Sequence, residues 1–218
     1  MYVKETADDN DNVIDSKLMT NNEVAKLKKE LGRGWIFIGS PLINPSTYKK
    51  LTCTMSVYQE TADNSYIILT NATWEHLGVY ISGESTPADK GYMAIAWGGN
   101  GEAFAASSMY FSGKYQNGSN MSSYSLAKSD TYNGYCWQFD ETTGGLFASP
   151  MDYADAHVTI NKKYPAYVNL LTNVKFTYIH TWESVKPTIT FGNNGSVSFS
   201  TSSTKWWPLE MDVAGLLY

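Results

Sequence analysis

The sequence predicts an all-β protein, an antiparallel β-sandwich with one short N-terminal helix. Three observations lead to this fold class. Many short segments alternate between apolar and polar residues, and Gly, Asn, Asp and Pro separate these segments. Charged residues make up 17% of the chain, below the usual ~25%, whereas aromatic residues reach 14% and can fill a core. At 218 residues, the chain is long enough for one large β domain.

The clearest strand signal lies in residues 164–182, YPAYVNLLTNVKFTYIHTW. Successive side chains of a strand point to opposite faces, so this alternation predicts a half-buried strand. Phe176 and every second residue around it form the predicted inward face, whereas Lys175 and Thr181 lie on the outward, solvated face. Because the strand is longer than most, we expect a bend or bulge near residues 171–173.

A single helix is predicted near the N-terminus, within residues 20–32. Thr20 and Glu23 match a capping box, the apolar residues that follow lie on one stripe, and Gly32 is a typical helix end. Residues 1–19 are acidic and polar, and they predict a flexible N-terminal arm. We therefore expect an arm at 1–19 and a single β-sandwich domain at 20–218.

Further strands are predicted in series along the rest of the chain. Their expected ranges are 35–40, 48–58, 65–75, 79–82, 91–97, 103–111, 135–139, 156–160, 188–191, 197–200 and 206–213. The second and third of these pair as a hairpin, and so do the two strands that flank residues 192–196. Residues 113–132 are rich in Gly, Ser, Asn and Tyr, and they predict a long surface loop or an exposed hairpin.

The charge of the chain argues against two classes of partner. The net charge is −5, and Lys26, Lys28 and Lys29 form the one cluster of basic residues in the sequence. Sustained contact with phosphates needs a basic groove, so nucleic acid and anionic membranes are poor partners. The sequence has neither CxxC nor HxxxH spacing, and we expect no metal and no cofactor.

Two cysteines, Cys53 and Cys136, occur in strand-like, aromatic surroundings. A possible disulfide between them would close a long loop and stabilise the fold by about 4–5 kcal/mol in the chain-entropy account. Two buried free thiols are the alternative, because free cysteine is a common core residue. The sequence leaves both interpretations open.

Three stretches carry a resemblance to known proteins: GYMAIAWGG at 91–99, FTYIHTW at 176–182 and WWPLEMDVAGLLY at 206–218. Together they resemble small exported proteins of Gram-positive bacteria, most of them without an assigned function. The resemblance implies a location outside a bacterial cell and transfers no catalytic motif. No apolar signal-peptide region follows Met1, so the expected protein is either cytosolic or a mature secreted domain with an added start Met. The low charge and the many Ser, Thr, Asn and Tyr residues favour the secreted domain.

Catalytic signals in the sequence are weak. Asp155 and His157 lie on one face of a predicted strand, and with a serine such as Ser149 they suggest a hydrolytic triad. The sequence has no GxSxG motif, so a hydrolase is the third of three functional hypotheses and we assign no catalytic residue. His180 is predicted to be a hydrogen-bonded core residue, and the Asp140-Glu141 pair is predicted to form a turn.

Aromatic and amide residues give the strongest chemical signal. Tyrosine presents a flat apolar face with a polar tip, which suits sugar rings and wet interfaces. The Gly- and Ser-rich middle of the chain concentrates such residues, and we expect ligand binding by Tyr110, Tyr115, Asn117, Asn120, Tyr124, Tyr132 and Asn133. The leading hypothesis is a secreted, non-enzymatic protein that binds a cell-surface glycan or protein.

Pore formation is the second hypothesis, and it alone involves a membrane. Strands that line a membrane barrel alternate apolar and polar residues over about nine residues or more. Residues 107–125 and 188–203 are rich in Ser and Thr and carry little charge. Either segment could refold into such a hairpin, although a soluble hairpin explains the same pattern.

Overall fold

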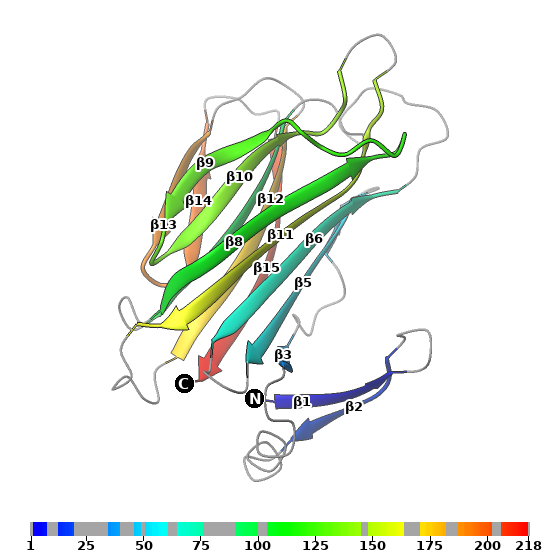
Figure 1. Ribbon diagram of the computed structural model, residues 1–218. Helices are drawn as coiled ribbons and strands as arrows, with labels where there is room; N and C mark the ends of the chain where they lie inside the picture. The colour runs from blue at the N-terminus through cyan, green and yellow to red at the C-terminus, as the bar shows by residue number, and fades with distance from the viewer. Residues whose placement is uncertain are drawn as a thin grey trace.

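The computed structural model describes residues 2–7, 13–19, 35–39, 46–48, 51–60, 65–75, 90–99, 104–144, 148–163, 171–181, 187–201 and 206–217. All regular structure in these ranges is β, and all the strand pairs are antiparallel. The predicted all-β class is therefore confirmed, and the arrangement is sandwich-like (Figure 1). The predicted helix at 20–32 lies outside the described residues. Within those residues, no helix has the length and apolar character needed to cross a membrane.

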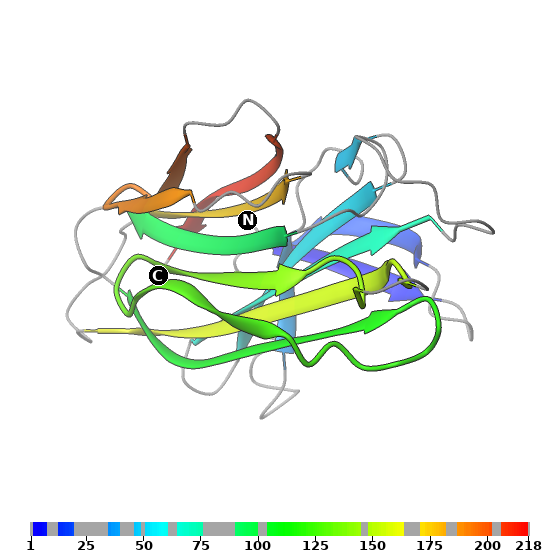
Figure 2. The same ribbon diagram turned by 90° about the horizontal axis from the view of Figure 1, so that it is seen from above.

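Two large sheets make up the two layers of the sandwich (Figure 2). The five-stranded sheet has the order β15 (Trp206–Leu217), β12 (Leu171–Thr181), β7 (Lys90–Gly99), β10 (Gly134–Asp140) and β9 (Tyr124–Asp130). The six-stranded sheet has the order β3 (Trp35–Gly39), β5 (Leu51–Glu60), β6 (Tyr66–Trp74), β11 (Met151–Lys162) and β8 (Phe104–Tyr115), and β4 (Ser46–Tyr48) also pairs with β5. The predicted β5–β6 hairpin is confirmed.

Two small hairpins complete the fold. Near the N-terminus, β1 (Tyr2–Ala7) pairs with β2 (Val13–Met19) inside the segment for which we predicted a flexible arm. The division into an arm and one domain stays a prediction. The second hairpin, β13 (Thr188–Gly192) with β14 (Ser196–Ser200), is the one that the sequence predicted around residues 192–196.

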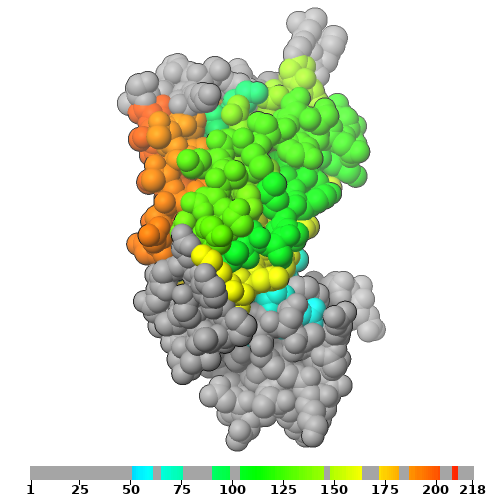
Figure 3. Space-filling view, turned by 60° about the vertical axis from the view of Figure 1, so that its left-hand side comes forward, coloured from blue at the N-terminus to red at the C-terminus, as the bar shows by residue number. Residues whose placement is uncertain are grey.

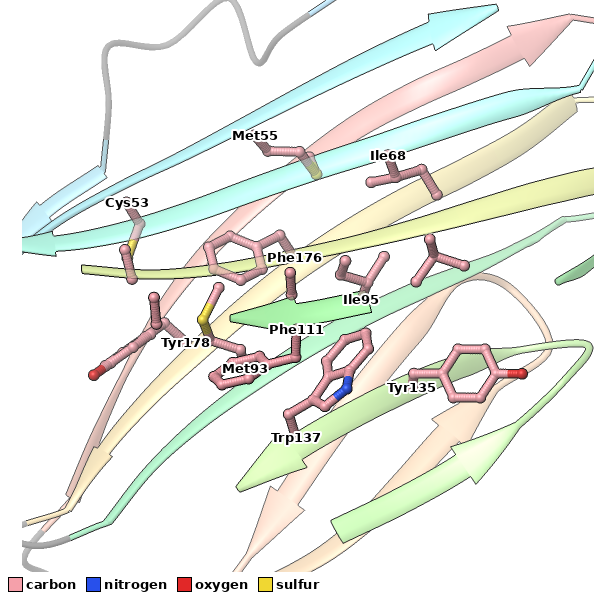
Figure 4. Close-up of a cluster of buried hydrophobic side chains, with 14 of the residues drawn as sticks. Cys53, Met55, Ile68, Met93, Ile95, Phe111, Tyr135, Trp137, Phe176 and Tyr178 are labelled. Atoms are coloured by element: carbon pink, nitrogen blue, oxygen red, sulfur yellow. The ribbon is translucent and has the colours of Figure 1, made fainter. Parts of the chain in front are cut away.

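The main core fills the space between the two large sheets. Alternate residues of β6, from Tyr66 to Trp74, point into it, as the sequence predicted. Figure 4 shows side chains of the six-stranded sheet, such as Met55 and Ile68, facing Phe176 of the five-stranded sheet. Burial of apolar side chains contributes about 25 cal/mol for each Å² removed from water, so this two-sided packing holds the layers together.

Strand β12 carries the predicted bulge and also departs from the prediction. Its pairing with β15 shifts register between Thr172 and Val174, where we expected an irregularity. The inward face is buried as predicted, with Phe176 fully inaccessible. On the outward face, Thr177, Ile179 and Thr181 are also buried, whereas Lys175 is partly exposed and Asn173, beside the bulge, is exposed. β12 is therefore a central strand covered on both faces from Thr177 to Thr181, and the prediction of a solvated Thr181 was wrong.

The β13–β14 hairpin covers that second face. Ile189 and Val197 of the hairpin join a separate apolar cluster with Ile179 of β12. Two glycines let the hairpin approach closely. A Cβ on Gly98 would lie 2.4 Å from the carbonyl oxygen of Asn193, and a Cβ on Gly134 would lie 2.7 Å from the Phe191 ring, both too close for any other residue.

The two cysteines lie in different apolar clusters, and both are free. Cys53 on β5 points into the main core (Figure 4), whereas Cys136 on β10 lies in the cluster under the hairpin. The five-stranded sheet separates the two clusters, so the side chains face different layers. Of the two interpretations, the structure shows buried free thiols, and the possible disulfide is not formed. Burial raises the pKa of both thiols far above the ordinary value.

One side of the sandwich brings the edges of both sheets together. β8 lies at the edge of the six-stranded sheet and β9 at the edge of the five-stranded sheet, and residues 116–123 join them. The backbone N–H of Ala106 donates to the carbonyl of Thr131 at one end, and that of Met121 donates to the carbonyl of Gly113 at the other. This β8–β9 seam contains most of the residues that the sequence singled out for binding. Figure 3 shows the green residues of this region on the surface, beside the orange hairpin.

Candidate binding site

A hollow of about 370 Å³ opens at the β8–β9 seam. We call it the tyrosine hollow, because three of its lining residues are tyrosines. Its walls are formed by Tyr110, Phe111, Ser112, Gly113, Lys114, Asn120, Met121, Tyr124 and Tyr153. The volume falls within the range of about 300–1,000 Å³ that small-molecule sites occupy. The hollow can therefore hold a ligand of the size of one or two sugar rings.

Tyr110 and Tyr124 present large aromatic surfaces to solvent, with 52% and 48% of their area exposed. Both rings are supported from behind. Tyr110 stacks on the ring of His157 at a centroid distance of 4.9 Å and an angle of 19°, and Tyr124 packs on Phe111 at 4.9 Å. These contacts limit the rotamers of both rings, so little conformational entropy remains to be lost when a ligand stacks on them.

Polar groups surround the aromatic walls. Asn120 and Lys114 are exposed, and their backbones pair in an isolated β-bridge. Ser112 lies two residues before Lys114 on β8, so its side chain is on the same face of the strand. An amide, an ammonium and a hydroxyl supply both donors and acceptors. Gly113 between them has no room for a side chain, since a Cβ would lie 2.8 Å from the carbonyl oxygen of Tyr153.

The structure brings three of the seven predicted ligand-binding residues together in the hollow: Tyr110, Asn120 and Tyr124. Asn117 lies nearby in the turn after β8, where its Oδ1 accepts hydrogen bonds from the N–H and the hydroxyl of Ser119 at 2.9 and 2.6 Å. Asn117 therefore shapes the turn rather than the wall of the hollow.

The other three predicted residues lie elsewhere. Tyr115 points inward and is 5% exposed, with its hydroxyl donating to the carbonyl of Asp140 at 3.2 Å. Asn133 is buried in the β9–β10 turn, where its side chain donates to a carboxylate oxygen of Asp130 at 3.0 Å. Tyr132 is exposed, but its ring lies 4.1 Å from the ammonium of Lys163, and neither residue lines the hollow.

Sequence reasoning missed Tyr153, Ser112 and Lys114. The prediction placed a strand at 156–160, whereas β11 runs from Met151 to Lys162. On this longer strand, Tyr153 shares the outer face with Asp155 and His157, and it pairs with Lys114 of β8. The alternation of residues 151–162 was the available signal, and extending it would have placed Tyr153 on that face.

A second polar cluster lies inside the protein. Glu141, Tyr178 and His180 are all fully inaccessible. The Tyr178 hydroxyl donates to one carboxylate oxygen of Glu141, and Nδ1 of His180 lies 2.7 Å from the other. Burial, followed by the charge of Glu141, raises the pKa of Tyr178 well above its ordinary value. We call these three residues the Glu141 cluster.

A glycine makes space for the Glu141 cluster. A Cβ on Gly91 of β7 would lie 2.5 Å from the Phe139 ring and 2.8 Å from Oε1 of Glu141. Glu141 stands in a bend directly after β10, at the strand end where the sequence predicted a turn, and its side chain continues the inward alternation of Trp137 and Phe139. The prediction of His180 as a hydrogen-bonded core residue is confirmed. Because no ligand can reach these groups in the folded protein, the cluster has a structural role.

The suggested hydrolytic triad does not form. Asp155 and His157 share a face as predicted, but Asp155 accepts a hydrogen bond from the Asn71 amide at 2.8 Å. Ser149 precedes the start of β11, so its hydroxyl is roughly 20 Å or more from His157 at the rise of an extended strand. The Ser149 hydroxyl instead accepts from the backbone N–H of Asn117 at 3.0 Å. In the described ranges, no group of three His, Cys, Asp or Glu residues could hold a metal ion.

The comparisons with known proteins give structural likeness only. No protein family and no curated protein matches the sequence. Among solved structures, a pore-forming protein is 8% identical and aligns over 90% of this chain and 95% of its own, with a TM-score of 0.41. A structure from a study of adhesion by Streptococcus parasanguinis fimbriae is 10% identical over 85% of this chain and 96% of its own, with a TM-score of 0.40.

A third similar structure is the collagen-binding domain of a Staphylococcus aureus adhesin. It is 9% identical and aligns over 63% of this chain and 86% of its own, with a TM-score of 0.31. All three TM-scores are below 0.5, and the three proteins differ in function. These likenesses therefore carry no argument for binding or for pore formation, and the function has to be argued from the site.

Proposed function

We propose that this protein is a non-enzymatic binding protein that recognises a cell-surface glycan through the tyrosine hollow. One observation carries the proposal: the half-exposed rings of Tyr110 and Tyr124 stand beside the polar groups of Lys114 and Asn120 in a single hollow. The apolar face of a sugar stacks on such rings, while its hydroxyls bond to amide and ammonium groups.

The net charge of the chain supports a neutral glycan as the ligand, and the resemblance to exported proteins supports a ligand outside the cell. The chain carries a net charge of −5 and one lysine in the hollow, which favours a neutral glycan over a polyanion. The low charged fraction and the resemblance to exported proteins of Gram-positive bacteria support a location outside the cell. A protein surface is the alternative partner, because tyrosine also suits protein interfaces.

A glycan array that includes neutral linear glycans tests this function. We expect retention of wild-type protein and a loss of at least about fivefold in affinity for Tyr110→Ala and Tyr124→Ala, measured by calorimetry with a retained glycan. Each variant removes an aromatic contact of about 1–3 kcal/mol. Tyr132→Ala is the matched control, because Tyr132 is 38% exposed and lies outside the hollow. No retention on the array, or an equal loss in the control, would overturn the proposal.

A second candidate function is pore formation, and the β13–β14 hairpin favours it. Apolar Ile189, Phe191, Val197 and Phe199 alternate with Thr and Ser, as in strands of membrane barrels. The other segment that we considered, residues 107–125, contains most of β8, which pairs with β11 and is not a separate hairpin. Strands of five residues are about half the length that spans a bilayer, so insertion would have to recruit flanking residues. Liposomes that stay intact at micromolar protein would dismiss this candidate.

A further inference from the structure

We infer that the glycan is a linear chain of at least two sugar units that passes over Tyr124 into a second hollow. The inference rests on the proposed function and adds the length and chemistry of the ligand. A smaller hollow of about 190 Å³ opens beside the first and shares Tyr124 as a wall. Its other lining residues are Lys90, Ser123, Ser125, Gln138, Phe139 and Asp140. We call it the amide hollow, after Gln138.

Tyr124 divides the two hollows because of its place on an edge strand. It is the first residue of β9 and stands opposite Phe139 of β10. Its ring leans across the seam onto Phe111 of β8, in the other sheet. Its partner Phe139 points into the main core, whereas Gln138 stands opposite Tyr92 and points to the outer face of the sheet. The tyrosine hollow therefore lies on the seam side of the edge strand β9, and the amide hollow lies on its outer face. Because Tyr124 is the first residue of an edge strand, a ligand that stacks on its ring can continue around the end of β9 and place its next unit in the other hollow.

The two hollows differ in their polar groups, so they suit different parts of one ligand. The tyrosine hollow combines aromatic walls with Lys114 and Asn120. In the amide hollow, the ammonium of Lys90 is paired with the carboxylate of Asp140, and each side chain is 30% exposed. A paired lysine and aspartate leave little net charge, so this hollow favours the neutral hydroxyl or amide groups of a ligand over a charged ligand.

Substitution of Gln138 tests the amide hollow alone, because Gln138 lines that hollow and does not line the tyrosine hollow. It lies on β10 opposite Ser125 of β9, and its side chain is partly exposed. Its amide offers a donor pair and an acceptor, the combination that hydroxyl and N-acetyl groups of a sugar can satisfy together. Asp140 is less suitable for a test, because its carbonyl accepts the Tyr115 hydroxyl and its neighbour is the buried Glu141.

Binding of two homologous series measures the length dependence: β-1,4-linked glucose and β-1,4-linked N-acetylglucosamine, each from the single sugar to the pentamer. In wild-type protein, we expect affinity to rise at least tenfold from the single sugar to the dimer or trimer. In Gln138→Ala, we expect this ratio to fall about five- to tenfold, the effect of one or two lost hydrogen bonds. Tyr132→Ala should keep the wild-type ratio, and unchanged urea midpoints would verify that each variant folds.

The outcomes separate the inference from the function beneath it. Equal affinity for the single sugar and its oligomers would contradict binding in the amide hollow. So would an oligomer-to-single-sugar affinity ratio that Gln138→Ala leaves unchanged. If the tyrosine variants still lost binding in that case, the proposed function would stand. If no member of either series bound at millimolar concentration and the array retained no protein, the proposed glycan function would be wrong, and the inference would fall with it.

Discussion

The Glu141 cluster and the tyrosine hollow use the same kinds of side chain for opposite purposes. Both combine aromatic rings with groups that donate and accept hydrogen bonds. In the Glu141 cluster, the carboxylate oxygens are held by Tyr178 and His180, and all three residues are inaccessible. In the tyrosine hollow, Tyr110 and Tyr124 are about half exposed, and the surrounding polar groups face solvent.

The difference shows that exposure, more than residue type, separates a structural cluster from a binding surface. A buried polar group has to find its partner within the protein, because leaving it unsatisfied costs about 1–3 kcal/mol. A half-exposed aromatic ring packs on the protein with one face and keeps its free face for a ligand. Substitutions in the first region should therefore change the free energy of unfolding, and substitutions in the second should change affinity.

The largest effect is expected for Glu141→Ala. This change leaves the Tyr178 hydroxyl and the His180 ring without their buried partner, at a cost of about 3–5 kcal/mol in the free energy of unfolding. Glu210→Ala is the matched control, because Glu210 forms an ion pair with Lys175 at 2.8 Å but is 48% exposed. An exposed pair contributes about 1 kcal/mol or less. Urea denaturation measures both, and equal losses would contradict a structural role for Glu141.

A smaller effect separates two tyrosine hydroxyls. Tyr178→Phe removes one donor to the buried carboxylate and should lower the free energy of unfolding by about 1–3 kcal/mol. Tyr124→Phe removes a hydroxyl from a half-exposed ring and should change it by no more than about 0.5 kcal/mol. Thermal and urea unfolding of the two variants would show this order. A loss in Tyr124→Phe as large as that in Tyr178→Phe would show that exposure does not separate the two regions.

The sequence predicted which residues form strands better than it predicted which faces are buried. The alternation in β12 located the strand, its inward face and its bulge. The same alternation could not show that the β13–β14 hairpin packs on the other face, because that contact joins segments far apart in the chain. Ile179 was the one apolar residue on that face among residues 173–181, and the small Ala94 and Ala96 on neighbouring β7 complete the covered surface.

The binding site was predicted in part for a related reason. Tyr110 and Tyr124 were predicted from composition, and both reach the tyrosine hollow. Tyr115 was predicted beside them, but β8 continues to Tyr115, which lies five positions after Tyr110 on the same strand. The two side chains therefore point to opposite faces. Tyr153 was missed because β11 comes beside β8 only through long-range pairing.

The smallest effect is expected at His157, which lies behind Tyr110. Burial lowers the pKa of His157, and the nearby charge of Asp155 opposes this shift only in part. Because the folded-state pKa is below the unfolded value of about 6.5, the unfolded chain binds more protons below that pH. The contribution of His157 is complete above about pH 6.5 and is lost as the pH falls through the folded-state pKa.

His157→Gln removes this contribution while keeping a polar side chain of similar length behind Tyr110. We expect the variant to lose less stability than the wild type between pH 7.5 and pH 5, measured as the difference between their urea midpoints at the two pH values. The buried His180 and the carboxylates are common to both proteins, so their titration cancels in this comparison. The effect should be small, because His157 is only partly buried. A larger loss of stability between pH 7.5 and pH 5 in the variant than in the wild type would mean that the fold stabilises the charged form of His157. The ring stacked on Tyr110 in this wall of the hollow would then be charged rather than neutral.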